Sequence, residues 1–389
     1  MIGKRKICVV TSARADYGLL QGLLTALVNA PDVTLQLIVT GMHLSHQFGF
    51  TVRQIEADGF DIAARVEIPL SSDTPAGIAR SMGFGTVGFG ETLAQLNPDI
   101  FVVLGDRFEI LAAAQAALVA RIPIAHIHGG EITEGAFDDS IRHAITKMAQ
   151  WHFVAADSYR DRVIQMGEDP SRVFVTGAPG LDHVVNMPFL DRKALEASLA
   201  MRLGRPLFLV TYHPVTLGIE DPLAAQGELL AALDRFPDAS IVFTHPNADP
   251  GGRALTLQLG EWVARNGSRA KSFTSLGQQR YLSLMRCADI VIGNSSSGII
   301  EAPALKRATV NIGDRQKGRL RARSVIDAPE DGASIKAAIE KALSANFQND
   351  LAETVSLYGM GGASAKIAEI LIHVPLTDQK RFFDIHLGS

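Results

Sequence analysis

The chain has 389 residues, of which 47% are hydrophobic and 20% charged, and its formal net charge is −4. This length and composition are typical of a globular protein with more than one domain, and they exclude a disordered chain. Most nucleic-acid-binding proteins carry an excess of basic residues, whereas this chain has a slight excess of acidic residues. No apolar run reaches the roughly 18 residues that a membrane span needs. Cys8 and Cys287 lie in apolar runs, which favours reduced thiols in a cytoplasmic protein.

The first half of the chain alternates short apolar runs with longer amphipathic segments. This pattern predicts βαβ units around a parallel sheet. We expect strands at 6–11, 35–40, 65–68, 100–105, 122–128 and 152–155. We expect a helix that includes Leu20, Leu23, Leu24 and Leu27, and further helices at 74–96, 109–120 and 159–166.

The run VFVTG, from residue 173, is expected to open a second series of the same kind. Further strands are predicted at 207–212, 240–245, 272–275, 289–292 and 309–312, with helices at 224–235, 255–265, 279–286, 298–305 and 363–372. The predicted fold class is therefore α/β, with two Rossmann-like, doubly wound parallel-sheet domains. We place the N-terminal domain at 1–171 and the C-terminal domain at 172–364.

Polar side chains gather after two neighbouring strands in the stretch 101–149. Because the carboxyl ends of parallel strands open onto the ligand crevice, we expect these side chains to meet there. They are Asp106, Arg107, Glu109, His126, His128, Glu131, Asp138, Asp139, Arg142 and His143. Strand alternation puts His126 and His128 on one face, which suggests a zinc site, but a third ligand at a recognisable spacing is absent, so we favour no metal.

The motif IVIGNSSSGIIEA at 290–302 predicts a strand, a turn of small hydroxyl residues and a helix. Backbone N–H groups at such a helix start favour an anion such as phosphate. Ser295 and Ser296 would add hydroxyl donors, and Glu301 could accept from ribose hydroxyls. The alternative is an ordinary serine-rich helix cap.

Three further positions follow predicted strands. Arg14, in SARADY, is either a phosphate clamp or a surface arginine. His213 and His245 each precede a proline, which holds the preceding residue extended and directs each imidazole out of the sheet edge. Two histidines at equivalent strand ends favour a functional role over a structural one.

Several of these motifs together resemble the UDP-N-acetylglucosamine 2-epimerase family, over residues 5 to 370. They are SARADYG, LGDRFE, HIHGGE, DDSIRHAITK, TYHPV, PNADPGG and GNSSSGIIEA. The resemblance is closest to the hydrolysing branch, which serves sialic-acid and legionaminic-acid biosynthesis. The non-hydrolysing branch has GTRPE and HVEAG where this chain has SARAD and HIHGG.

The resemblance implies a GT-B fold, with both domains facing a central cleft that holds the nucleotide sugar. It also implies that segment 365–389 rejoins the N-terminal domain. Asp106 falls on the family's catalytic aspartate, whereas His128 stands where the family has a strand-end glutamate, so Glu131 or His128 itself takes over that role. The remaining residues carried over as catalytic or substrate-binding are His213, Arg14, Arg107, Asp138, Arg142, Asn247, Ser295, Ser296, Glu301 and Arg315.

The expected reaction starts with loss of UDP, which acidifies the C2 proton, and it needs a dipole-lined diphosphate site and a base poised near neutral pH. Water then adds to the glycal, which gives a free N-acetylmannosamine-type sugar. The expected substrate is UDP-N-acetylglucosamine or UDP-2,4-diacetamido-2,4,6-trideoxyglucose, with no metal or redox cofactor and a homodimer or homotetramer as the assembly. A non-hydrolysing epimerase, a GT-B glycosyltransferase and a silent nucleotide-sugar binder remain as alternatives.

Overall fold

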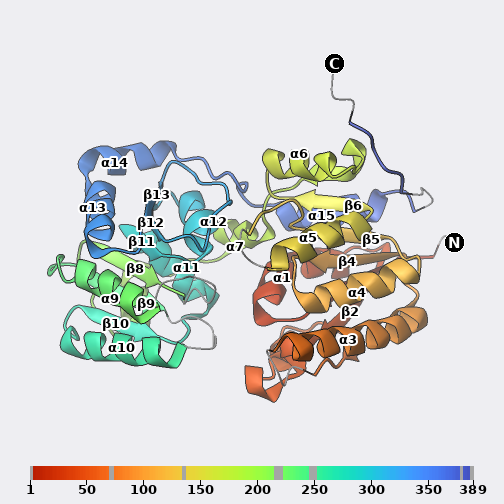
Figure 1. The fold of residues 1–389 in the computed structure, drawn as a ribbon, viewed down its shortest axis with the longest axis horizontal. Coiled ribbons are helices and arrows are strands. Elements are labelled where there is room, and N and C mark those ends of the chain that lie inside the picture. The colour runs from red at the N-terminus through yellow and green to blue at the C-terminus, as the bar shows by residue number, and fades with distance from the viewer. Residues whose placement is uncertain are drawn as a thin grey trace. The chain divides into compact units, whose positions relative to one another are not determined.

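The computed structural model describes residues 3–69, 74–133, 137–213, 222–244, 252–376 and 380–385. The chain divides into two compact units, each with its own parallel sheet (Figure 1). Unit 1 comprises Met1–Asp182 and Tyr358–Ser389, and unit 2 comprises His183–Leu357. Among the described residues, none of the helices combines the length and the apolar character needed to cross a membrane.

The sheet of unit 1 has seven strands within the described residues, in the order β3-β2-β1-β4-β5-β6-β7. The strand order reverses between β1 and β4, which makes this the switch point of a doubly wound sheet. The strands are β1 (Arg5–Thr11), β2 (Val33–Thr40), β3 (Ile62–Val66), β4 (Ile100–Leu104), β5 (Ile124–Ile127), β6 (Trp151–Val154) and β7 (Val173–Val175).

Helices cover both faces of this sheet, so its central strands are apolar over most of their length. Ile7 and Val9 of β1 pack on one side with α1 and α15, whereas Cys8 and Val10 pack on the other side with α3, α4 and α5 (Figure 1). The helices are α1 (Arg14–Val28), α2 (Val52–Ala57), α3 (Pro75–Leu96), α4 (Phe108–Val119), α5 (Phe137–Met148), α6 (Asp157–Gln165) and α15 (Ala363–His373).

One strand lies in a different sheet from the one expected. The prediction that residues 173–177 open the second series is wrong, because β7 pairs in parallel with β6 and forms the edge of the first sheet. The Asp169-Pro170 pair marks only a short turn, in which the Asp169 carboxylate accepts a hydrogen bond from the Ser171 N–H at 2.8 Å. A proline turn stops a helix or strand without ending a domain.

The sheet of unit 2 repeats the same arrangement. Its six strands in the described residues have the order β10-β9-β8-β11-β12-β13, with the reversal between β8 and β11. The strands are β8 (Leu207–Thr211), β9 (Ser240–Thr244), β10 (Ala270–Phe273), β11 (Ile290–Gly293), β12 (Ala308–Ile312) and β13 (Val325–Ala328). The helices are α7 (Asp182–Asn186, beginning in unit 1), α8 (Arg192–Leu199), α9 (Pro222–Leu233), α10 (Gly252–Arg265), α11 (Gly277–Cys287), α12 (Ser297–Ala304), α13 (Gly332–Leu343) and α14 (Ala345–Asp350).

The last helix of the chain packs within unit 1. Ile367 and Leu371 of α15 are buried against α1. The two carboxylate oxygens of Asp182 accept hydrogen bonds from the Ala363 and Ser364 N–H groups, each at 2.8 Å. Asp182 thereby satisfies N–H groups in the first turn of α15, which have no partner inside the helix.

Replacing Asp182 with alanine is expected to destabilise unit 1 by about 2 kcal/mol, because two buried N–H groups lose their acceptor. Urea unfolding followed by circular dichroism measures this loss. Asp331→Ala is a suitable control, because Asp331 caps the exposed start of α13 in unit 2. If Asp182→Ala costs no more than the control, Asp182 does not anchor α15.

Candidate functional site

The loop between β1 and α1 in unit 1 is held by one buried carboxylate. Asp16 accepts hydrogen bonds from the Ser12 N–H, the Ala13 N–H and the Ser12 hydroxyl, each at 2.8 Å. These bonds fix the loop at the switch point of the sheet. Arg14, the first residue of α1, is exposed.

The first turn of α4 contains a second organising carboxylate. Glu109 is fully buried and accepts hydrogen bonds from Arg107, at 3.1 Å from Nη2 and 3.3 Å from Nε. The Arg107 side chain remains 37% exposed. Glu109 therefore fixes the direction of a guanidinium that still reaches the surface, a positioning role that sequence reasoning did not assign.

Asp106 lies directly after β4 and pairs with Arg142 of α5. The Arg142 Nη2–H donates to the Asp106 carboxylate and to the Thr133 hydroxyl, the latter at 3.1 Å. Arg142 is only 4% exposed, and its Nε–H and Nη1–H have no acceptor among the residues that the structure describes. Because a buried donor normally has an acceptor, these two nitrogens are candidates for ligand binding.

His128 and Glu131 form a pair at the end of β5. The His128 Nδ1 lies 2.6 Å from Glu131 Oε1, and because a carboxylate only accepts, Nδ1 carries the hydrogen. The His128 backbone has a φ of 65°, so the chain turns sharply as it leaves the strand. This pairing gives a histidine oriented by a buried carboxylate, as in many acid–base sites.

Asp138 lies in the first turn of α5. Burial raises the pKa of its carboxyl to about 6, and the negative charge of nearby Asp106 contributes to the rise. A carboxyl group that titrates near neutral pH is suited to proton transfer. Sequence reasoning gave Asp138 a substrate-binding role, because neither its burial nor its distance from Asp106 can be read from the chain.

His126 and His128 have different partners. His126 lies in β5 and is fully buried, with its ring nitrogens facing the Thr146 hydroxyl and the Gly105 carbonyl. Across the described ranges, no group of three or more His, Cys, Asp or Glu side chains is arranged to hold a metal ion.

The switch point of unit 2 is built around Gly293 and Asn294. A Cβ on Gly293, whose φ is 131°, would lie 1.9 Å from the Thr211 carbonyl oxygen, so only glycine fits. Asn294 is fully buried; it accepts from the His213 N–H at 2.7 Å and donates to the His213 carbonyl at 2.9 Å. Asn294 therefore ties the ends of β8 and β11 together, which sequence reasoning missed.

Three serines lie at the start of α12, where the Ser297 N–H donates to the Ser295 hydroxyl at 3.4 Å. The Ser296 side chain makes no capping hydrogen bond. The Ser295 and Ser297 hydroxyls lie 3.0 Å apart, and the Ser297 hydroxyl lies 2.6 Å from the hydroxyl of the half-buried Tyr281. The capping alternative therefore does not account for Ser296.

Arg315 and Gln316 close the site from the β12 side. Both donate to the Asn294 carbonyl, at 3.0 and 2.9 Å. Burial, with the positive charge of Arg315, lowers the pKa of His213 to about 4, so this imidazole is neutral at pH 7. Glu301 lies on α12 and is half-buried. The predicted residues His245 and Asn247 lie outside the described residues.

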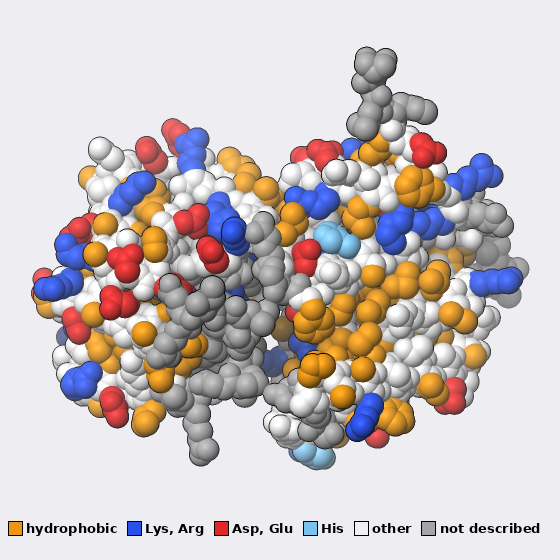
Figure 2. All heavy atoms as spheres, in the orientation of Figure 1, with side chains coloured by type: hydrophobic (Ala, Val, Ile, Leu, Met, Phe, Trp, Pro, Cys, Tyr) orange, Lys and Arg blue, Asp and Glu red, His pale blue; other side chains and the backbone are white. Residues whose placement is uncertain are grey.

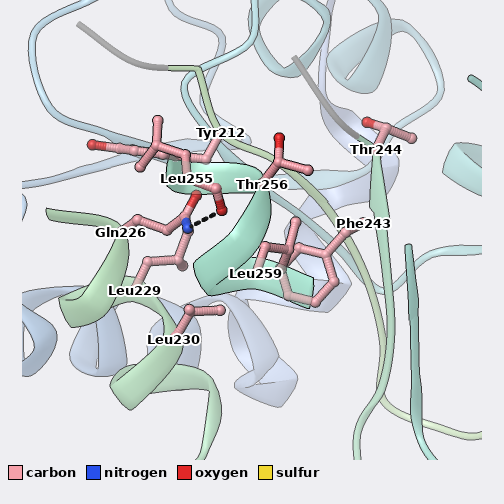
Figure 3. Close-up of a pocket in the computed structure, with 9 residues that line it drawn as sticks. All are labelled: Tyr212, Gln226, Leu229, Leu230, Phe243, Thr244, Leu255, Thr256 and Leu259. Carbon is pink, nitrogen blue, oxygen red and sulfur yellow. Dashed lines mark hydrogen bonds between the residues drawn. The ribbon is translucent and has the colours of Figure 1, made fainter. Parts of the chain in front are cut away.

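A small pocket lies beside these strand ends, between β8, β9, α9 and α10 (Figure 3). Tyr212 and Thr244 line one side, and the Gln226 Nε2–H donates to the Leu255 carbonyl at 2.8 Å on the other. Its volume of 20 Å³ suffices for about one water molecule. It is too small for a nucleotide or a sugar.

The chain matches the family model described as UDP-N-acetylglucosamine 2-epimerase over residues 25–372. A relative from Campylobacter jejuni, described as GDP/UDP-N,N′-diacetylbacillosamine 2-epimerase (hydrolyzing), is 43% identical over 349 residues, which are 90% of each chain. Polysialic acid biosynthesis protein P7 from Escherichia coli is 36% identical over 385 residues, or 98% of each chain.

A similar solved structure is the UDP-GlcNAc 2-epimerase of Neisseria meningitidis bound to UDP-GlcNAc. Its TM-score is 0.71 at 18% identity, and the match covers 94% of this chain and 99% of that chain. Together with the two doubly wound sheets, this similarity confirms the predicted class of two Rossmann-like domains in a GT-B-like fold.

Proposed function

Because the chain belongs to the UDP-N-acetylglucosamine 2-epimerase family, we propose that it is a hydrolysing nucleotide-sugar 2-epimerase, which releases UDP and a free 2-epimerised sugar. The observation that carries the proposal is the set of proton-transfer groups at the ends of β4 and β5 and the start of α5. Asp106, Asp138 and the His128–Glu131 pair would have no C2 proton to transfer in a glycosyltransferase or a silent binder. The Campylobacter relative, described as hydrolyzing, supports the same reading.

The proposed substrate is a nucleoside-diphosphate 2,4-diacetamido-2,4,6-trideoxyglucose, and the product enters nonulosonic-acid biosynthesis of the legionaminic or sialic type. The support is the 43% identity with a relative described as acting on N,N′-diacetylbacillosamine, a sugar of this class. The relative's description covers GDP as well as UDP. UDP-N-acetylglucosamine is the second candidate, since it is the ligand of the similar Neisseria structure.

Unit 2 is proposed to hold the nucleotide. The α12 N-terminus with Ser295 and Ser296 suits the diphosphate, and Glu301 suits the ribose hydroxyls. Arg315 and the neutral imidazole of His213 would donate to phosphate oxygens, as would Arg14 and Arg107 of unit 1 and Asn247. These donors stabilise the negative charge that develops as the diphosphate leaves C1.

Unit 1 is proposed to carry the proton transfers. The Asp106–Asp138 carboxyl pair takes the C2 proton as the C1–O bond to UDP breaks, which leaves a C1=C2 double bond. Water then adds its oxygen to C1 and gives up a proton, while His128, oriented by Glu131, delivers a proton to the other face of C2. Arg142 binds the substrate with its two remaining donors. The sum is nucleotide sugar plus water to UDP plus the epimerised free sugar.

The rate is expected to rise with pH through about 6, because Asp138 accepts a proton only when it is ionised. Below its pKa, kcat should fall about tenfold per pH unit. The variant Asp138→Asn should lack this inflection and lose about 100-fold in kcat. A wild-type pH–rate profile that is flat through this range, in protein that remains folded, would remove Asp138 from the proton transfer.

We further propose a cytoplasmic homodimer or homotetramer. Phe84 and Val87 of α3 and Leu118 and Val119 of α4 are between 50% and 83% exposed. Figure 2 shows hydrophobic side chains gathered over the face of unit 1 where these helices lie. Light scattering should give an oligomeric mass that Val119→Glu reduces to that of the monomer; a monomeric wild type contradicts the assembly.

A direct comparison of substrates tests the proposed function. We expect UDP-2,4-diacetamido-2,4,6-trideoxyglucose to give the highest kcat/KM for release of the nucleoside diphosphate. The GDP form of this sugar, which would release GDP, and UDP-N-acetylglucosamine are the two other substrates compared. A higher kcat/KM for UDP-N-acetylglucosamine would assign the second candidate. Absence of turnover with all three, in protein that binds them, would indicate a transferase or a binder.

A further inference from the structure

His126 is a buried imidazole to which the proposed reaction gives no task. It lies in β5 and has no exposed surface. Its Nε2 lies 2.8 Å from the Gly105 carbonyl oxygen, and its Nδ1 lies 3.1 Å from the Thr146 hydroxyl. The ring therefore joins the end of β4 to helix α5.

The protonation of this ring follows from its partners. A carbonyl oxygen can only accept, so Nε2 carries a hydrogen. Burial lowers the pKa of His126 to about 3, so the ring is neutral and Nδ1 accepts. The Thr146 hydroxyl then shares its single hydrogen between the Arg142 carbonyl, to which it donates at 3.0 Å, and His126 Nδ1, which lies 3.1 Å away. The neutral Nε2–H tautomer satisfies both contacts.

The two ends of this bridge are next to proposed site residues. Gly105 immediately precedes Asp106, and Thr146 lies one helical turn after Arg142. The backbone at Gly129 packs closely against His126 and Thr146. A Cβ on Gly129 would lie 3.2 Å from His126 Nδ1 and 3.1 Å from the Thr146 hydroxyl. A change in the ring would therefore move β4 relative to α5.

We propose that His126 is a positioning residue, whose neutral ring sets the distance between Asp106 on the β4 loop and Arg142 on α5. The bridge would hold the Asp106 carboxylate and the Arg142 guanidinium at a fixed distance from each other, while the His126 ring itself does not contact the substrate. The effect on rate rests on the proposed function. The bridge and its tautomer do not.

Long-range ¹H–¹⁵N spectra of the imidazoles in the full-length protein test the bridge without any substrate. We expect the His126 signals to show the neutral Nε2–H tautomer unchanged from about pH 5 to about pH 8. The variant His126→Gln assigns the resonance. An Nδ1–H tautomer, or titration within this range, overturns the proposal whatever reaction the protein catalyses.

Thr146 variants test the effect on rate, because they leave both the ring and the site residues in place. Thr146→Val is expected to lower kcat about tenfold and to change KM by less than about twofold. The distance between Asp106 and Arg142 would change, while substrate binding would be kept. Thr146→Ser retains the hydroxyl and should restore kcat to within about threefold of wild type. Equal kcat in the valine and serine variants overturns the positioning role.

His152 supplies a matched control. It is also fully buried, it pairs in register with His126 across β5 and β6, and it bonds to Glu168 instead of a site loop. His152→Gln should lower the melting temperature but leave kcat within about twofold of wild type. A loss of kcat in His152→Gln as large as in Thr146→Val would show that any disturbance of these strands slows the enzyme, and it would overturn the specific role of His126. If wild type turns over no nucleotide sugar, the proposed function fails and the spectra alone decide the bridge.

Discussion

Replacing Asp106 with asparagine is expected to lower kcat for UDP release by about a thousandfold, with little change in the fold. Asparagine keeps the acceptor for Arg142 but removes the negative charge at the end of β4. In the proposed reaction, one of the two carboxyl groups assigned to the C2 proton is then missing. Single-turnover release of UDP measures the effect even when the residual rate is low.

The pH dependence separates this role from simple damage. Because the charge of Asp106 contributes to the raised pKa of Asp138, its removal should move the inflection near pH 6 to lower pH. Asp99→Asn is the control, since Asp99 lies just before the opposite end of β4 and accepts from the Lys6 N–H at 2.8 Å. An Asp106→Asn enzyme with wild-type kcat, or one no slower than Asp99→Asn, contradicts the account.

Replacing Glu168 with glutamine is expected to destabilise unit 1 by about 3 kcal/mol, because the change breaks a buried ion cluster. Glu168 is 2% exposed and accepts from three side chains: Lys147 at 2.5 Å, Lys380 at 2.7 Å and His152 at 3.0 Å. Lys380 belongs to the C-terminal segment, so the cluster fastens that segment to α5 and β6. The neutral side chain of glutamine cannot compensate the positive charges of the two ammonium groups.

The same cluster predicts a pH dependence of stability. Burial raises the pKa of Glu168, but the hydrogen bonds from His152, Lys147 and Lys380 outweigh burial and lower the pKa to about 2. A carboxyl group whose pKa is lower in the folded protein than in the unfolded chain stabilises the folded protein at pH values above the unfolded pKa. The stability is therefore lost as the pH falls from about 4.5 towards 2.

Urea midpoints measured across this acid range test the cluster. Wild type should lose stability towards low pH more steeply than Glu168→Gln. Glu56→Gln is the control, because Glu56 pairs with Arg65 on the surface of the same unit, where both side chains are 48% exposed. The control should cost less than about 1 kcal/mol. A Glu168→Gln variant as stable as the control would refute the role of the cluster.

The repeated strands of the fold could be predicted because buried parallel strands leave continuous apolar runs in the sequence. The runs at β4 and β8 are fully buried, β1 is buried from Ile7 to Thr11, and all three lie within a residue of their predicted positions. In contrast, β13 has one buried residue in four and was missed, and the apolar run of β7 does not say which sheet it joins. The apolar pattern of a weakly buried edge strand is too weak for the sequence to predict where the strand lies.

The strand-end residues could be predicted because parallel topology brings consecutive loops to one edge. The roles of Asn294 and Glu109 could not, since hydrogen bonds depend on the folded distance. Asn294 bonds to a residue 81 positions away. The raised pKa of Asp138 likewise depends on burial and on Asp106. The site chemistry therefore becomes visible only in the folded chain.

The central claim is that the C2–H bond and the bond to UDP both break in this protein. Incubation with UDP-2,4-diacetamido-2,4,6-trideoxyglucose in D2O, without an acceptor, followed by NMR of the products, tests it most directly. The account predicts UDP and a free manno-configured sugar that carries deuterium at C2. A manno-configured sugar still attached to UDP, or free sugar with protium at C2 and unchanged configuration, would contradict it.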